Sequence, residues 1–162
     1  MKKIITTTLL TLTLTHNVLA EDAASVSVKR LTLNSATSIA QGAIDSCREK
    51  GIQVGVTVVD RNGIVQVAMR DTLASPIVLT VSEGKAKAAA LFGTSTAELK
   101  ERSEGPLGRL PGLVMSQGGL IIQAGGQTYG AIGVSGAPSG ATDDECAIEG
   151  MKSVVEDLEM GM

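Results

Sequence analysis

Aromatic side chains are scarce in this chain, whose 162 residues include one Phe, one Tyr and no Trp. Proteins that bind single-stranded nucleic acid stack bases on aromatic rings, and nucleic-acid-binding domains carry a basic excess. This chain has neither feature, since its net charge is −3 at pH 7. We therefore expect no nucleic-acid partner. The length of the chain predicts one domain, and its 43% hydrophobic residues, which are nearly all aliphatic, are enough to form a mainly aliphatic core.

Histidine is the second shortage, because His16 is the only one and lies in a segment typical of a secretory signal peptide. Lys2 and Lys3 form the basic start of this segment, an apolar run follows, and the small residue Ala20 ends it. The run is too short to span about 30 Å of hydrocarbon, which argues against a membrane anchor. The sequence predicts a signal peptide over residues 1–20 and a periplasmic or secreted protein.

Cleavage after Ala20 would leave residues 21–162 as a single domain without histidine, and loss of Lys2 and Lys3 would change the net charge from −3 to −5. Such a chain has no His-based catalytic triad, no His-ligated zinc site and no His-ligated haem. No later segment is long and apolar enough to span a bilayer, so we expect no membrane insertion after cleavage.

Apolar residues at helical spacing predict three helices, over residues 33–50, 77–92 and 142–158. Two β-branched runs flank Asn62-Gly63, which favours a tight turn, and predict a hairpin. A second hairpin is predicted across Gly125-Gly126. Because hairpins pair neighbouring strands, the predicted fold class is α+β, with helices packed on an antiparallel sheet.

Two S/T-x-x-E sequences have the pattern of a capping box, in which the first side chain accepts a hydrogen bond from a backbone N–H of the helix. They predict that a short helix runs from Ser95 to about Arg102 and that the last helix begins at Thr142. Residues 105–115 hold two prolines and three glycines and are predicted to form a loop.

Glycine-rich stretches raise the question of a phosphate site, above all Gly118-Gly119 and residues 130–136. The second stretch resembles part of the G-x-G-x-x-G dinucleotide pattern, but no helix is predicted to begin directly after it and the βαβ context is missing. Close packing of the backbone or a bulge is the simpler interpretation of glycines in a strand.

Several stretches taken together resemble the GlcG/HbpS-like family of haem-binding proteins. They are residues 85–99 (KAKAAALFGTSTAEL), 118–120, 130–136 and 144–147, and residues 58–63 and 69–71 fit the family's first hairpin. The resemblance covers about residues 31–158, and Ile121 departs from it by standing where the family usually has proline. It implies a profilin-like fold, a homo-oligomer and, since some relatives bind haem, a small-molecule ligand.

A haem site would need an iron ligand other than histidine. The candidate donors are a Ser or Thr hydroxyl and the side chains of Tyr129, Met69, Met115, Cys47 and Cys146. The alternative is that Tyr129 fills the sheet surface and that the methionines pack in the core.

Cationic side chains would pair with the propionates of a haem, or else be ordinary surface cations. The resemblance places Lys85 on a helix near the glycine loop. The candidate ligand-binding residues are Arg70, Asp71, Lys85, Met115, Gly118, Gly119 and Tyr129.

Three functions remain open from the sequence. The first is a secreted, oligomeric protein that binds haem or another anionic planar ligand. The second is an enzyme acting on a small carboxylate or ring substrate, with Lys85 as base or Schiff-base amine. The third is a non-catalytic assembly or sensor partner.

The two cysteines, Cys47 and Cys146, fall near the end of the first predicted helix and the start of the last. If these helices pack antiparallel on one face of the sheet, the two positions come close and a disulfide is predicted, as an oxidising compartment would permit. Two buried free thiols are the alternative.

Overall fold

The computed structural model describes residues 24–161, so the predicted signal peptide lies outside the described residues. The elements in chain order are α1 (Leu33–Glu49), β1 (Gly55–Asp60), β2 (Val65–Arg70), α2 (Ile77–Phe92), the 3-10 helix η1 (Thr96–Leu99), α3 (Lys100–Glu104), the 3-10 helix η2 (Pro106–Arg109), β3 (Gly119–Ala124), β4 (Gln127–Ser135) and α4 (Gly140–Met160). The predicted α+β class is confirmed.

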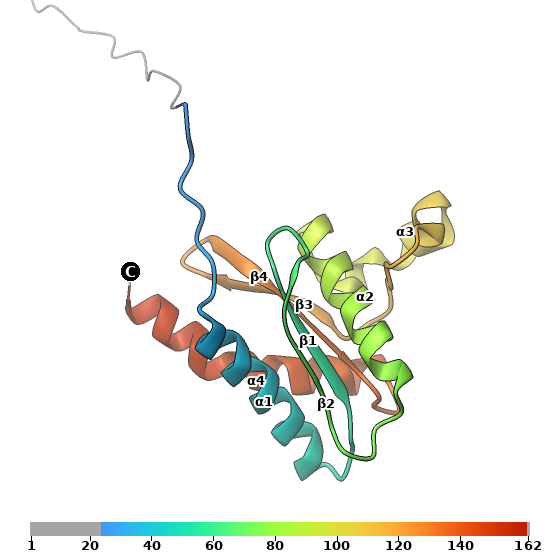
Figure 1. The fold of residues 1–162 in the computed structure, drawn as a ribbon. Helices are drawn as coiled ribbons and strands as arrows, with labels where there is room; N and C mark the ends of the chain where they lie inside the picture. The colour runs from blue at the N-terminus through green and yellow to red at the C-terminus, as the bar shows by residue number, and fades with distance from the viewer. Residues whose placement is uncertain (1–23, 162) are drawn as a thin grey trace, which may run out of the picture.

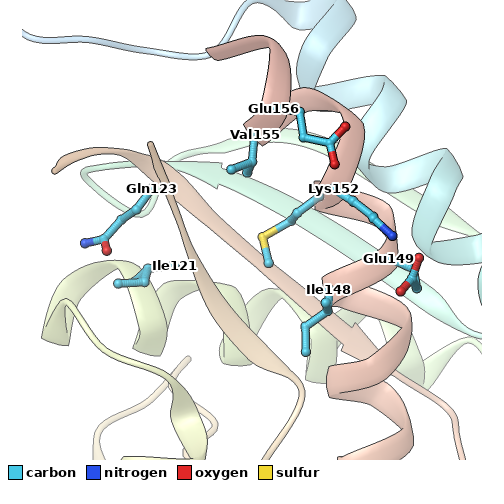
Figure 2. Close-up of a pocket in the computed structure, with 8 residues that line it drawn as sticks. Ile121, Gln123, Ile148, Glu149, Lys152, Val155 and Glu156 are labelled. Carbon is cyan, nitrogen blue, oxygen red and sulfur yellow. The ribbon is translucent and has the colours of Figure 1, made fainter. Parts of the chain in front are cut away.

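The four strands form one antiparallel sheet in the order β2-β1-β4-β3 (Figure 1). Each predicted hairpin is present, and β1 pairs with β4 to join the two hairpins. Gly63 and Gly126 lie in the turns with φ of 77° and 74°, a backbone region that favours glycine. This order leaves β3 at one edge of the sheet, beside α4 (Figure 2).

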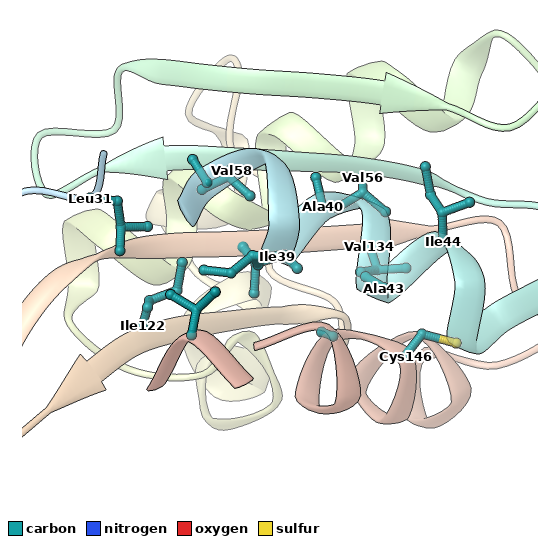
Figure 3. Packing of buried hydrophobic residues seen from close by; sticks show 14 of the residues in the cluster. Leu31, Ile39, Ala40, Ala43, Ile44, Val56, Val58, Ile122, Val134 and Cys146 are labelled. Atoms are coloured by element: carbon teal, nitrogen blue, oxygen red, sulfur yellow. The ribbon is translucent and has the colours of Figure 1, made fainter. Parts of the chain in front are cut away.

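Helices cover both faces of the sheet, because side chains alternate between the faces along β1 and β4. Val56 and Val58 point into the main core, which packs under α1 and α4 (Figure 3). On the opposite face, Val59 packs against alanines of α2, and the hydroxyl of Thr57 lies 2.8 Å from that of Ser82. The result is three layers, with α2 on one side of the sheet and α1 with α4 on the other.

Glycines allow close packing both between layers and between the two helices of one layer, and the strand glycine Gly133 agrees with the sequence interpretation. A Cβ atom on Gly133 of β4 would lie 2.0 Å from the carbonyl oxygen of Ser82 in α2. A Cβ atom on Gly150 of α4 would lie 2.6 Å from the backbone nitrogen of Ala43 in α1. Any larger residue at either position would push a helix outward.

The start of the last helix differs from the prediction. The helix begins at Gly140, and Ser139 is its N-cap, with a hydroxyl that accepts a hydrogen bond from the backbone N–H of Thr142. The prediction that Thr142 caps the helix is therefore wrong, because Ser139 provides an earlier acceptor. Ser95 occupies the N-cap position of η1 without a capping hydrogen bond from its side chain.

The predicted loop over residues 105–115 contains the 3-10 helix η2, in which Pro106 occupies the first turn. Proline tolerates that place because the first N–H groups of a helix have no intrahelical partner. None of the helices in residues 24–161 combines the length and apolar character that a membrane crossing requires.

Candidate ligand-binding site

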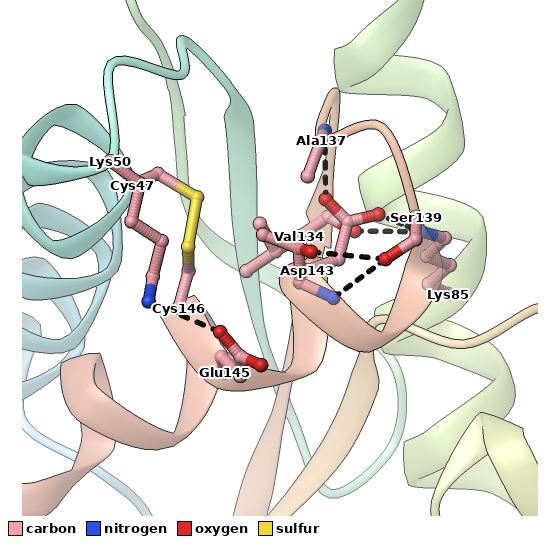
Figure 4. The surroundings of a disulfide bond; sticks show 10 residues. Cys47, Lys50, Lys85, Val134, Ala137, Ser139, Asp143, Glu145 and Cys146 are labelled. Atoms are coloured by element: carbon pink, nitrogen blue, oxygen red, sulfur yellow. Dashed lines mark hydrogen bonds and ion pairs between the residues drawn. A yellow bond between two sulfur atoms is a disulfide. The ribbon is translucent and has the colours of Figure 1, made fainter.

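A buried ion pair joins three elements at one end of the sheet. Lys85 lies on the buried face of α2, and its Nζ donates to Oδ2 of Asp143 at 2.7 Å and to the carbonyl oxygen of Val134 at 2.9 Å (Figure 4). The other carboxylate oxygen of Asp143 accepts a hydrogen bond from the backbone N–H of Ala137 at 3.1 Å. The side chains of Lys85 and Asp143 are 4% and 5% exposed. The pair therefore ties α2, the end of β4 and the first turn of α4 together.

The neighbouring carboxylate, Asp144, holds the loop that leads into β3. Its Oδ1 accepts from the backbone N–H of Gly118 at 2.8 Å, and its Oδ2 accepts from the side chain of Gln117 at 3.4 Å. Burial raises the pKa of Asp144 above the usual range, and the Gly118 N–H opposes this. Burial also raises the pKa of Asp143, against the opposing effects of the Lys85 ammonium and the Ala137 N–H.

Gly118 and Gly119 pass directly over this ion pair. Gly118 has φ of 114°, and a Cβ atom there would lie 2.5 Å from Nζ of Lys85 and 2.6 Å from the carbonyl oxygen of Val134. A Cβ atom on Gly119 would lie 2.6 Å from the Lys85 carbonyl oxygen. The two glycines allow a close backbone approach, and the N–H of Gly119 donates to the hydroxyl of Thr96 at 2.9 Å.

An open cleft lies next to the glycine loop. Its volume is about 410 Å³, and it is lined by Thr96, Ala97, Lys100, Ser103, Met115, Ser116 and Gln117. Met115 forms its buried wall, packed with Ala88 and Leu99, whereas Lys100 is exposed and is the one cation in the lining. We call this the Met115 cleft. It combines an apolar wall, hydroxyl groups and a single positive charge.

The structure brings three of the predicted site residues together, namely Lys85, Gly118 and Gly119, and a fourth, Met115, lines the neighbouring cleft. Sequence reasoning missed Lys100, Ser103 and Ser116, which line the same cleft. The short elements η1 and α3 carry no periodic pattern that would have pointed to them.

The other predicted site residues lie elsewhere. Tyr129 is 5% exposed and belongs to the main core under α1 and α4, on the face of the sheet opposite Lys85. The buried carboxylate of Asp71 accepts from Nε and Nη2 of Arg48 at 2.7 and 2.8 Å. Arg70 donates to the carbonyl oxygens of Asp71 and Ala74. The hydrogen bonds of Arg70 and Asp71 therefore hold the end of β2 in place.

The Arg48–Asp71 pair predicts a specific response to acid. The hydrogen bonds from Arg48 hold the pKa of Asp71 below its ordinary value of 3.8. A lowered pKa contributes stability above the unfolded-state value, and this contribution is lost as the pH falls through the folded-state value. Asp71→Asn should therefore melt well below the wild type near neutral pH, and the gap should narrow below about pH 4.

Thermal unfolding followed by circular dichroism between about pH 7 and pH 2 measures this gap. Asp45→Asn is the matched control, because Asp45 contacts the same arginine from an exposed position, where an ion pair contributes little. A constant difference between the melting temperatures of wild type and Asp71→Asn across the acid range would contradict the prediction.

A disulfide joins Cys47 at the end of α1 to Cys146 in α4, with an S–S distance of 2.08 Å and a Cα–Cα distance of 5.5 Å (Figure 4). The two helices run antiparallel, since Gly42, earlier in α1, lies against Gly150, later in α4. Both cysteines are fully buried. Neither sulfur is available as a thiolate ligand.

The residues around the Met115 cleft offer little to a haem iron. Strong axial ligands are histidine, thiolate and phenolate. The described residues contain no histidine, both cysteines are in the disulfide, and Tyr129 is buried on the other face. The thioether of Met115 is the one sulfur in the cleft lining. The site therefore does not fit a haem held through a strong iron ligand.

Comparison with known proteins gives a family match. The family model described as "Haem degrading protein HbpS-like" matches residues 31–152. A solved structure of HbpS is 35% identical, with 85% of this chain and 99% of that chain covered and a TM-score of 0.76. A double mutant of Streptomyces reticuli HbpS is 34% identical, with 85% and 95% covered and the same TM-score of 0.76.

A more distant structure shares the fold. The PduOC:Heme complex is 24% identical, with 75% of this chain and 93% of that chain covered and a TM-score of 0.68. No curated protein matches the chain.

Proposed function

The chain belongs to the HbpS-like family, and on this premise we propose that it is a secreted, oligomeric protein that binds a planar anionic ligand, with haem as the first ligand to test. The family is described as haem-degrading, and a structural neighbour has been solved with haem. The observation that carries the proposal is the Met115 cleft, which lies next to the Gly118-Gly119 loop and has the predicted site residue Met115 in its lining.

The chemistry of the cleft suits a ligand with an apolar ring and a carboxylate. Met115 supplies an apolar, polarisable wall for a ring. The ammonium group of Lys100 supplies a charge-assisted hydrogen bond for a carboxylate at the rim. Lys85 does not bind the ligand carboxylate, because its ammonium group already donates hydrogen bonds to Asp143 and to the carbonyl oxygen of Val134. We therefore assign carboxylate recognition to Lys100.

Binding through the ring and the carboxylates requires no strong iron ligand. Metal-free protoporphyrin should then bind about as well as ferric haem, because the two share the ring and both propionates. This expectation separates the proposal from a haem site built around an axial ligand.

Absorbance and fluorescence titrations of purified protein, lacking residues 1–20, test the proposal with both porphyrins. We expect saturable binding of both, and Lys100→Glu should weaken it about tenfold by placing a negative charge beside the ligand carboxylate. Lys29→Glu makes the same charge change at an exposed position and should leave the affinity unchanged. Met115→Leu keeps the apolar wall and should change the affinity for either porphyrin by less than about threefold.

Two results would reject the proposal. One is a haem spectrum identical to that of free haem at every protein concentration. The other is an equal effect of Lys100→Glu and Lys29→Glu, which would assign the attraction to overall charge rather than to the Met115 cleft.

Export to the periplasm or the medium is part of the proposal. Its support is the signal-like sequence of residues 1–20 together with the Cys47–Cys146 disulfide, a bond that persists in oxidising compartments. The enzymatic alternative with Lys85 as a free amine gains no support, since that amine is buried and ion-paired.

A further inference from the structure

Gln117 is the one residue in the lining of the Met115 cleft whose side chain is held by α4. The Nε2 atom of Gln117 donates to Oδ2 of Asp144 at 3.4 Å. Within residues 24–161, this is the only hydrogen bond of the Gln117 side chain. The amide oxygen, Oε1, is therefore left available at the cleft.

The direction of this amide follows from the chemistry of its partner. An ionised carboxylate has acceptor oxygens and no donor, so Gln117 must turn its NH₂ group, and not its oxygen, toward Asp144. The other carboxylate oxygen, Oδ1, accepts from the backbone N–H of Gly118 at 2.8 Å. Asp144 thus binds two successive residues of one loop.

The backbone of this loop is attached on both sides. A Cβ atom on Gly140, the first residue of α4, would lie only 2.5 Å from Cβ of Gln117, so the start of the helix packs directly against Gln117. The carbonyl oxygen of Gly118 accepts from the backbone N–H of Val134 in β4 at 2.7 Å. Gln117 therefore has a defined position at the cleft.

Resting on the proposed function, we propose that Asp144 is a positioning residue, which holds the Gln117 amide so that its Oε1 accepts a hydrogen bond from the bound ligand. The ligand class of the Met115 cleft is then a ring carboxylate that also carries an O–H or N–H donor. Lys100 binds the carboxylate, Met115 packs against the ring, and Gln117 selects for the donor.

A fixed amide selects more strongly than a free one. A ligand without the donor would cover Oε1 and leave it unpaired, which costs free energy. A free glutamine side chain could avoid this cost by turning to solvent, but the hydrogen bond to Asp144 restricts that rotation. The selectivity therefore depends on Asp144 as well as on Gln117.

Two porphyrins that differ in donor groups test the proposal. Haematoporphyrin has the ring and both propionates of protoporphyrin, with two hydroxyethyl groups in place of the vinyl groups. Fluorescence titration at about pH 8, well above the usual pKa of a carboxylate, gives the ratio of their affinities. Gln117→Met keeps the side-chain length and should lower the preference for haematoporphyrin about three- to tenfold, with less than a threefold change for protoporphyrin.

Asp144→Ala should lower the same preference, although Gln117 is intact in this variant. Hydrogen–deuterium exchange read by mass spectrometry tests the loop without any ligand. Exchange in residues 116–119 should quicken in Asp144→Ala and stay near the wild-type rate in Asp144→Asn, whose side-chain oxygen can still accept from the N–H of Gly118.

A second Gln–Asp pair provides matched controls. On α1, Nε2 of Gln41 donates to Oδ1 of Asp45 at 2.8 Å, in an exposed position outside the lining of the Met115 cleft. Gln41→Met and Asp45→Ala should leave the porphyrin preference and the exchange of residues 116–119 unchanged. Circular dichroism would confirm that each variant is folded.

Failure of the proposed function and failure of this inference give different results. A wild type that binds neither porphyrin rejects the proposed function, and the inference with it. Binding of both porphyrins with a preference that Gln117→Met leaves unchanged rejects the inference alone. Because Gln117 is exposed, this variant decides the matter even if Asp144→Ala does not fold. In a folded Asp144→Ala, an unchanged preference or unchanged exchange also rejects the inference.

Discussion

Replacement of Lys85 by methionine is expected to lower the free energy of unfolding by about 3 to 5 kcal/mol. The substitution keeps the length of the side chain but leaves Asp143 as a buried carboxylate with only the Ala137 N–H as partner. It also deprives the carbonyl oxygen of Val134 of a hydrogen bond. Since a domain of this kind is stable by about 5 to 15 kcal/mol, the effect approaches the whole stability of the fold. Urea denaturation followed by circular dichroism measures the change.

Lys87→Met is the matched control for this experiment. Lys87 lies on the same helix and pairs with Glu83, but its side chain is 32% exposed, and a surface pair contributes about 0 to 1 kcal/mol. The double variant Lys85→Met with Asp143→Asn removes both charges and should be more stable than Lys85→Met alone. Equal losses in Lys85→Met and Lys87→Met would show that the buried pair contributes nothing beyond a surface pair.

Removal of the disulfide is the second change with a large expected effect. The bond closes a loop between residues 99 positions apart, and in the chain-entropy account such a loop stabilises the folded state by about 4 to 5 kcal/mol. The double variant Cys47→Ala with Cys146→Ala should lose about this much in urea denaturation, because its unfolded chain is no longer constrained. Replacing both cysteines avoids leaving a reactive thiol.

Reductant provides the control for the disulfide. Denaturation of the wild type with dithiothreitol should approach the result for the double variant, whereas the double variant should not respond to reductant. Mass analysis after alkylation without reductant should find no modified cysteine in the wild type. Two alkylated cysteines in that sample would show that the bond is absent and would remove the basis of the prediction.

Much of the fold could be predicted because its signals are local. The stripe from Ala36 to Cys47 repeats every three to four residues, which indicates one buried face of a helix whatever lies beneath it. Asn62-Gly63 sets a tight turn through the conformational freedom of Gly63, so β1 and β2 pair wherever the hairpin docks. The start of α4 was missed for an equally local reason, since both Ser139 and Thr142 are good N-cap residues and only the backbone shows which one caps.

The candidate site was predictable only in part. The resemblance to the family pointed to Lys85 by placing it on a helix near the glycine loop, and Gly118-Gly119 stood out as a glycine-rich stretch. The partner of Lys85 could not be derived from the sequence, since the Lys85–Asp143 bond joins residues 58 positions apart. Lys100 is one exposed lysine among several until the cleft beside Met115 is seen.

The sequence by itself determined the aliphatic core, the helices and hairpins, and the absence of histidine chemistry after residue 20. Each of these follows from composition or from neighbours a few residues apart. Only the tertiary structure decided that Asp143 is the buried partner of Lys85, that Tyr129 lies in the opposite layer from the Met115 cleft, and that Cys47 meets Cys146. The reason is physical: burial and ion pairing depend on the path of the chain through the sheet, and side chains far apart in sequence alter each other's charge and exposure only once packing has brought them into contact.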